Sequence, residues 1–183
     1  MEPCRELIVV MGPSGCGKST IGRLLADSLR HPFIEGDDHH PAANKRKLAS
    51  GRPLTDEDRE AWVDGLAQEC RARPQRSLVL ACSALTKYVQ SRLRAESERR
   101  VCFVLLDVPR SELVQRLEIR EGHFMPAALA DSQLSALDPP ADALRIDATP
   151  DAAAVVSMLC AALGERGNEQ DDQKASRSDD GRG

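Results

Sequence analysis

The chain has 183 residues, a formal net charge of -4, 41% hydrophobic and 30% charged residues, and only 3% aromatic residues. This length and composition predict a single globular domain, and they argue against a nucleic-acid partner because there is neither a basic field nor a set of stacking residues. No apolar run approaches the ~20 residues that span a bilayer, so we expect no membrane partner. The six cysteines lack a C-x-x-C pair and the chain start lacks a signal-peptide pattern, which predicts a cytoplasmic protein.

The first expected elements are a β-branched strand over 6–11 and a helix over 19–30, joined by the turn GPSGCGKST. This turn matches the phosphate-loop pattern G-x-x-x-x-G-K-[ST] in the required context, between a strand and a helix. Its backbone N–H groups can surround phosphate oxygens, Lys18 brings positive charge to the β- and γ-phosphates as a catalytic residue, and Ser19 offers an oxygen to Mg²⁺. The predicted nucleotide-binding residues of this loop are Gly12, Pro13, Ser14, Gly15, Cys16, Gly17, Lys18, Ser19 and Thr20.

A second short strand over 32–35 leads into EGDDHHP, residues 35–41, where acidic and imidazole side chains are crowded together. The cluster alone is compatible with a metal site, a substrate pocket or a solvated loop, since carboxylates and imidazoles serve in all three. Open α/β sheets place ligands at the carboxyl ends of their strands, which favours Asp37 as a site residue. The residues alone leave these three possibilities open, with Asp37 as the best-placed candidate.

The middle of the chain predicts a short helix over 44–50, then a longer helix that opens with a capping box of Thr55 and Asp58. Two near-continuous apolar runs, 77–83 and 100–107, predict strands that are covered on both faces, with a helix over 86–95 between them. The second run ends at Asp107 and resembles a Walker-B strand. Any buried strand followed by a polar turn has the same pattern, so Asp37 is the better candidate for the site.

The last third predicts a helix from Pro109 through Arg120, a helix over 127–137, a weak strand over 143–147 and a helix over 151–163 with Asp151 as its N-cap. This alternation predicts an α/β fold with a mostly parallel sheet. The tail over 164–183 has almost no hydrophobic residue, and we expect it to be disordered.

The segment REGHFMP joins two of these helices and carries basic groups, Arg120 and His123, on either side of Gly122, with Arg116 one turn earlier. Basic side chains on a glycine hinge can close over a transferred phosphate and exclude water, as a kinase lid must do. The alternative is a plain turn whose arginines run along the surface. The phosphate loop upstream favours the lid.

Seven segments, in chain order, resemble the motifs of the gluconokinase family of small P-loop kinases, which is related in architecture to shikimate kinase. They are GPSGCGKS, EGDDHHP, NKRK, GRPLTDEDR, CSAL, REGHFMP and SQLSALDPP. The resemblance covers about residues 6–163. It implies transfer of the ATP γ-phosphoryl group to the 6-hydroxyl of D-gluconate with Mg²⁺. It also implies a three-layer α/β/α kinase domain over 1–163 with a five-stranded parallel sheet, a mobile lid at about 120–127 and, commonly, a homodimer.

The same resemblance implies roles for single residues on the acceptor side. Asp37 resembles the catalytic carboxylate near the acceptor hydroxyl, and His40, Lys47 and Arg59 resemble contacts to the sugar acid. The planar fork of Arg59 suits the gluconate carboxylate.

On the nucleotide side, the resemblance implies that Arg116 is the base that faces the nucleotide and that Arg120 is a catalytic phosphate clamp. His123 is expected to bind substrate from the same lid.

The sequence departs from the family pattern in places. Glu35 stands where an aspartate is usual, and Thr86, Val89 and Gln90 replace polar residues that follow C-S-A-L in the family. Two other readings therefore stay open. One is a kinase of shikimate, another aldonate or a nucleoside monophosphate, and the other is a nucleotide-binding regulator without turnover.

Overall fold

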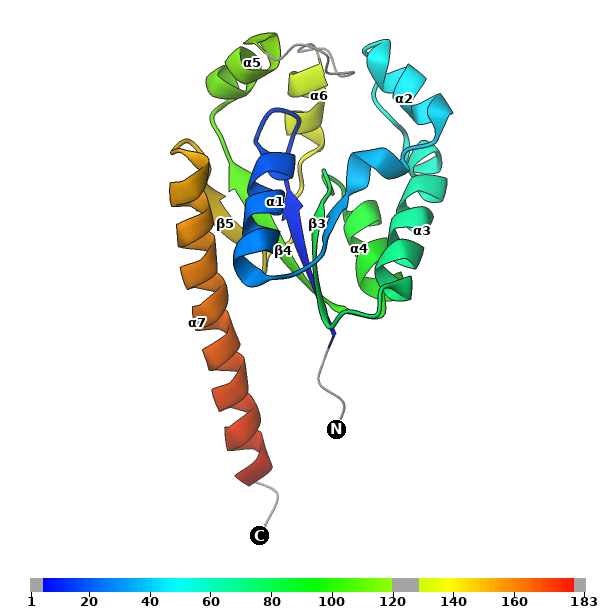
Figure 1. Cartoon of the computed structure of the whole chain (residues 1–183). Coiled ribbons are helices and arrows are strands. Elements are labelled where there is room, and N and C mark those ends of the chain that lie inside the picture. The colour runs from blue at the N-terminus through cyan, green and yellow to red at the C-terminus, as the bar shows by residue number, and fades with distance from the viewer. Residues whose placement is uncertain (1–4, 120–128, 180–183) are drawn as a thin grey trace.

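The computed structural model describes residues 5–119 and 129–179 (Figure 1). Its centre is a five-stranded sheet in the order β2-β3-β1-β4-β5, in which every neighbouring pair is parallel. The strands are β1 (Glu6–Met11), β2 (Phe33–Glu35), β3 (Ser77–Ala81), β4 (Arg100–Asp107) and β5 (Leu144–Asp147). The predicted α/β class with a parallel five-stranded sheet is confirmed. All carboxyl ends lie at one edge, where such sheets bind ligands.

Helices cover both faces of this sheet and bury a separate apolar cluster on each (Figure 1). Helices α1 (Lys18–Leu29) and α7 (Ala152–Asp179) lie on one face, and α3 (Asp56–Ala72) and α4 (Lys87–Glu96) lie on the other. Strand β1 shows the two-sided burial most clearly. Its Leu7 and Val9 side chains belong to the α3 and α4 side, whereas Ile8 and Val10 belong to the α1 and α7 side. The apolar runs thus form strands that are covered on both faces, as predicted.

Four short helices stand at the carboxyl edge of the sheet. A 3-10 turn, η1 (Gly36–His39), carries the acidic cluster directly after β2, and α2 (Ala42–Ala49) follows it. Helices α5 (Arg110–Ile119) and α6 (Leu129–Ala136) flank the undescribed segment that contains the expected lid. No helix among the described residues is long and apolar enough to cross a membrane.

The two helix N-caps that the sequence predicted are both present in the structure. Thr55 accepts a hydrogen bond from the backbone N–H of Asp58, and the Asp58 carboxylate accepts one from the backbone N–H of Thr55, so the predicted capping box is present. The carboxylate of Asp151 accepts the backbone N–H of Ala154, as expected for the N-cap of α7.

Two boundaries differ from the prediction. Strand β3 ends at Ala81 and not at 83, because the chain turns out of the sheet before Ala84, which has a left-handed backbone with φ of 42°. Helix α7 continues to Asp179, whereas we expected disorder from residue 164. A helix satisfies its own backbone hydrogen bonds without a buried face, and Glu, Gln, Lys, Arg and Ala in the tail favour helix. A lack of core-forming side chains therefore does not exclude a helical tail.

We predict that removal of residues 164–183 changes the melting temperature by less than about 4 °C, which is roughly 1 kcal/mol for a domain of this size. The reason is that Leu163 still packs against the core, while Gly164 and Glu165 are exposed. Differential scanning calorimetry of the full and shortened chains measures the shift. A larger drop would show that the tail packs on the domain.

Candidate active site

The phosphate loop joins β1 to α1 and has the backbone that its glycines predict. Gly12, Gly15 and Gly17 have φ of 141°, 86° and 101°, values that residues with a Cβ rarely adopt. A Cβ on Gly12 would also lie 2.8 Å from the Sγ atom of Cys16. These positions of the loop thus favour glycine, as expected for a loop whose backbone N–H groups surround phosphate oxygens.

A small polar hollow marks the centre of this loop. It is lined by Ser14, Gly15, Gly17, Lys18, Ser19, Thr20 and, from η1, Asp37. The ammonium of Lys18 donates to the carbonyl of Pro13 at 3.0 Å, so it is held within the loop. The structure thus places the two predicted catalytic residues, Lys18 and Asp37, at one hollow. They come from different parts of the chain, since Lys18 follows β1 and Asp37 follows β2.

Several side-chain oxygen atoms lie close to Ser19. Glu35 accepts a hydrogen bond from the Ser19 side chain, and its Oε2 atom lies 3.6 Å from Nη2 of Arg23. Burial raises the pKa of the Glu35 carboxyl, with a further upward contribution from the charge of Asp37. These are hard oxygen donors of the kind that Mg²⁺ prefers, and no group of three His, Cys, Asp or Glu residues in the described chain could hold a metal alone. The residues fit a magnesium ion that takes its other ligands from phosphate and water.

Asp107 does not join this group. It lies at the exposed end of β4, in a separate hollow with Asp147 and Thr149. Of the two candidate carboxylates, Asp37 is the one at the phosphate loop, and the Walker-B resemblance of Asp107 has no support among the described contacts.

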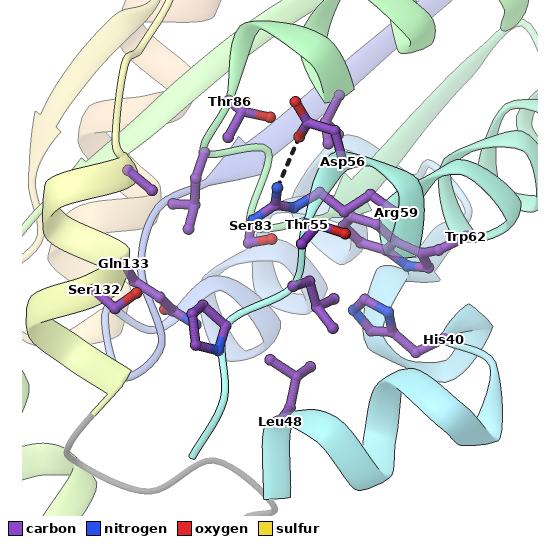
Figure 2. Close-up of a pocket in the computed structure, with 15 residues that line it drawn as sticks. His40, Leu48, Thr55, Asp56, Arg59, Trp62, Ser83, Thr86, Ser132 and Gln133 are labelled. Carbon is purple, nitrogen blue, oxygen red and sulfur yellow. Dashed lines mark hydrogen bonds and ion pairs between the residues drawn. The ribbon is translucent and has the colours of Figure 1, made fainter. Parts of the chain in front are cut away.

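A cavity of about 390 Å³ opens beside the phosphate loop (Figure 2), within the usual size range of small-molecule sites. Its walls come from five places: the segment from η1 through α2, the loop before α3, α3 itself, the segment from the end of β3 into α4, and α6. The lining residues are His40, Leu48, Pro53, Leu54, Thr55, Asp56, Arg59, Trp62, Ser83, Leu85, Thr86, Val89, Ser132, Gln133 and Ala136.

His40 and Trp62 form one wall of this cavity as a stacked pair. Their ring centroids are 4.2 Å apart and their planes differ by 13°. The indole N–H of Trp62 donates to the carbonyl of Gly36 at 2.8 Å, which ties α3 to η1. The Nε2 atom of His40 lies 3.9 Å from Oδ1 of Asp37. His40 therefore reaches from the acceptor cavity toward the carboxylate at the phosphate loop.

Burial lowers the pKa of His40 to about 4, with the positive charges of Lys45 and Arg59 acting in the same direction and Asp37 opposing them. The imidazole is therefore neutral at pH 7. Its Nδ1 atom is buried and has no hydrogen-bond partner among the described residues. Buried polar atoms are nearly always paired, with protein groups, ordered water or a ligand, so this atom is a candidate for a hydrogen bond from outside the protein.

Arg59 and Lys47, both expected to contact the sugar acid, occupy different places. The Nη1 atom of Arg59 lies 2.8 Å from Oδ1 of Asp56 at the cavity wall (Figure 2), and its side chain is 16% exposed. Lys47 does not line the cavity. Its ammonium pairs with the Asp58 carboxylate, and this hydrogen bond, with those from Thr55, lowers the pKa of Asp58 to about 2. Here Lys47 joins α2 to α3, because the α3 capping carboxylate lies within its reach.

Arg116, predicted to face the nucleotide, lies beside the phosphate loop. Its guanidinium donates to the carbonyl of Ala148 at 2.9 Å and to that of Cys16, in the phosphate loop, at 3.5 Å. Burial raises the pKa of the Cys16 thiol, so the loop cysteine is a packed neutral group. The predicted lid residues Arg120 and His123 lie outside the described residues.

Sequence reasoning missed three polar residues at the cavity or behind it. Thr86 is the N-cap residue of α4, yet its hydroxyl makes no cap and has no described partner. The side-chain carbonyl of Gln133 accepts the backbone N–H of Ser14 at 2.6 Å. Gln90 points away from the cavity and donates to the carbonyls of Ala84 and Asp138 at 2.8 and 2.9 Å. The motifs CSAL and SQ marked these segments, but no local pattern gave the role of each residue.

Comparisons with known proteins agree with this geometry. The shikimate kinase family profile matches residues 14–142. The gluconokinase of Gluconobacter oxydans is 45% identical over 141 residues, which covers 75% of this chain and 78% of that protein. The thermosensitive gluconokinase of Escherichia coli is 40% identical over 159 residues, or 84% of each chain.

Solved structures give the same result. The crystal structure of a gluconokinase from Sinorhizobium meliloti superposes with a TM-score of 0.82 at 35% identity, and the match covers 94% of this chain and 99% of that one. Shikimate kinase from Aquifex aeolicus shares the fold, with a TM-score of 0.61 at 15% identity, over 88% of this chain and 98% of that one. The chain belongs to the gluconokinase family, within the shikimate kinase-like group of P-loop kinases.

Proposed function

We propose that this protein transfers the γ-phosphoryl group of ATP to the 6-hydroxyl of D-gluconate, giving 6-phosphogluconate and ADP. The observation that carries the proposal is the position of Asp37. It lines the hollow of the phosphate loop, and its carboxylate lies 3.9 Å from His40, which lines the acceptor cavity. A donor on the loop and an acceptor in the cavity would thus meet at one carboxylate. The homodimer and the cytoplasmic location stay predictions.

In this mechanism, Asp37 accepts the proton of the acceptor hydroxyl as that oxygen forms its bond to the γ-phosphorus and the bond to the β-phosphate oxygen breaks. Lys18 and backbone N–H groups of the loop stabilise the charge on the transferring group. Ser19, with Glu35 and Asp37, would hold Mg²⁺ bound with the nucleotide, and the ion would neutralise phosphate charge.

The cavity supports a polyhydroxy acid as the acceptor. Arg59 offers a cation for a carboxylate, while Nδ1 of His40 and the hydroxyl of Thr86 are buried polar atoms that await partners. Leaving such atoms unpaired costs about 1–3 kcal/mol each, so hydroxyls of a bound ligand would recover that energy. A neutral His40 suits this purpose, since it can exchange hydrogen bonds with a hydroxyl without placing a second charge in the pocket.

The direct test is an acceptor panel. With ATP and Mg²⁺, coupled ADP release should appear with D-gluconate and not with shikimate or a nucleoside monophosphate. Asp37→Asn should lower kcat by about a hundredfold or more, because the variant keeps the size of the side chain but cannot take the proton. ATP affinity should stay nearly unchanged. Turnover with another acceptor, or an unchanged rate in the variant, would contradict the proposal.

Trp62 is the only tryptophan and lies in the cavity wall, so its emission should report acceptor binding. Gluconate should change it in a saturable way, and glucose, which lacks a carboxylate, should not. Arg59→Ala should weaken gluconate binding about tenfold to a hundredfold, the range for a hydrogen bond to a charged group. Arg52→Ala removes an exposed cation outside the cavity and serves as the matched control. If both variants lose the same affinity for gluconate, Arg59 acts only through the overall charge of the protein, and the proposed contact to the carboxylate is wrong.

The neutral state of His40 has a consequence for stability. Between pH 6.5 and about 4 the unfolded chain binds a proton at His40 that the folded chain does not, so the free energy of unfolding should fall as pH falls through this window. From pH 7 to pH 5, wild type should lose about 2 kcal/mol more than His40→Gln, at about 1.4 kcal/mol per pKa unit. Urea unfolding at both pH values measures this. Parallel losses in the two proteins would mean that His40 is not held neutral.

A further inference from the structure

Gln90 is a buried residue of α4 that is bonded to two of the segments around the acceptor cavity, although it does not line the cavity itself. It is 4% exposed. Its Nε2 atom donates to the carbonyl of Ala84, in the segment after β3, at 2.8 Å, and to the carbonyl of Asp138, in the segment after α6, at 2.9 Å. One amide group thus joins segments from distant parts of the chain.

Both of these segments help to form the wall of the cavity. Ser83, Leu85 and Thr86 line it from the segment after β3. Helix α6 contributes three further lining residues, Ser132, Gln133 and Ala136 (Figure 2). Asp138 comes shortly after the last residue of α6, so a bond to its carbonyl restrains the carboxyl end of that helix. Gln90 therefore stands behind two parts of the wall at once.

Two other described contacts join the same two segments. The backbone N–H of Asp138 donates to the carbonyl of Leu85 at 2.9 Å. The ammonium of Lys87 lies 3.0 Å from Oδ2 of Asp138, but the two side chains are 76% and 57% exposed, and exposed ion pairs contribute little to stability. Of the two side-chain links, the buried one, from Gln90, is therefore the one expected to hold the segments together.

The segment after β3 depends on such contacts because of its backbone. Ala84 has φ of 42°, in the left-handed region that residues with a Cβ rarely adopt. A backbone of this kind persists only where the surrounding contacts hold it, and the bond from Gln90 to the Ala84 carbonyl is one of them. Without that donor, the carbonyl would have to move to find another partner. Its neighbours Ser83 and Leu85, which line the cavity, would move with it.

We propose that Gln90 is a positioning residue for the acceptor: its amide fixes the segment after β3 and the carboxyl end of α6 relative to one another. It thereby sets the affinity for the acceptor without touching the acceptor or the nucleotide. The phosphate loop lies between β1 and α1, so the position of the nucleotide does not depend on this link. The inference rests on the proposed function, because it takes the cavity to be the acceptor site.

Steady-state kinetics of Gln90→Met test the inference. Methionine is similar to glutamine in length but donates no hydrogen bond, so both carbonyls lose this partner. The KM for gluconate should rise about tenfold, the effect of losing two ordinary hydrogen bonds. The kcat and the KM for ATP should stay within about twofold, as expected when only acceptor binding is weakened. A residue that only stabilised the fold would instead lower the melting temperature and leave both KM values unchanged.

Two further variants complete the test. Lys87→Met removes the exposed ion pair between the same two segments and is the matched control, so its kcat and both KM values should stay within about twofold of wild type. Gln90→Asn keeps the amide but is one methylene shorter and cannot reach both carbonyls, so it should raise the KM for gluconate by less than Gln90→Met does. If Gln90→Met does not fold, Gln90→Asn decides the question by the same comparison of KM values.

The outcomes also distinguish this inference from the proposed function. Turnover of shikimate and not of gluconate by the wild type would overturn the function, and the same variants assayed with shikimate would still test Gln90. Gluconate turnover by the wild type, with an unchanged KM for gluconate in both Gln90 variants, would leave the function standing and overturn the positioning role. An equal rise in the KM values for gluconate and ATP would overturn that role as well.

Discussion

The hydrogen bond from the indole of Trp62 to the carbonyl of Gly36 is the contact on which the acceptor side of the site depends. Gly36 begins η1 and lies so close to the end of β3 that a Cβ would come within 2.5 Å of the Ala81 carbonyl. The turn is therefore pressed against the sheet on one side and held by α3 on the other. Asp37 is the next residue, so its position at the phosphate loop follows from these two constraints. The same indole stacks on His40 and sets the cavity wall.

The charges around the cavity are arranged so that a ligand carboxylate can enter at small cost. Arg59 is largely buried, while its partner Asp56 is 56% exposed. An ion pair with one exposed member contributes little, roughly 0–1 kcal/mol, because water solvates the carboxylate well when the pair opens. A substrate carboxylate could therefore replace Asp56 with little penalty. Among the described residues that line the cavity, no other Lys or Arg competes for this role, and His40 is neutral.

The sequence predicted those features that depend on residues close together in the chain. The phosphate loop was predictable because its glycines impose a backbone, and the capping box was predictable because its partners are three residues apart. The alternation of strands and helices was enough for a parallel sheet. The ion pair of Lys47 was not predictable because its partner, Asp58, belongs to another helix, and Gln133 was missed because its partner is in the first turn of the fold. Such long-range contacts follow from packing, which periodicity does not encode.

The departures from the family pattern after C-S-A-L now divide into two kinds. Gln90 is a structural residue, since both of its described bonds hold backbone carbonyls on the loops around it. Thr86 and Val89 instead line the cavity, one with an unpaired hydroxyl and one with an apolar face. Under the proposed function, replacement of charged or long polar groups by these two leaves Arg59 as the one cation of the described wall for the acceptor's carboxylate. In the same proposal, the acceptor's hydroxyls would meet neutral groups, His40 and Thr86, which select by hydrogen-bond geometry and not by charge.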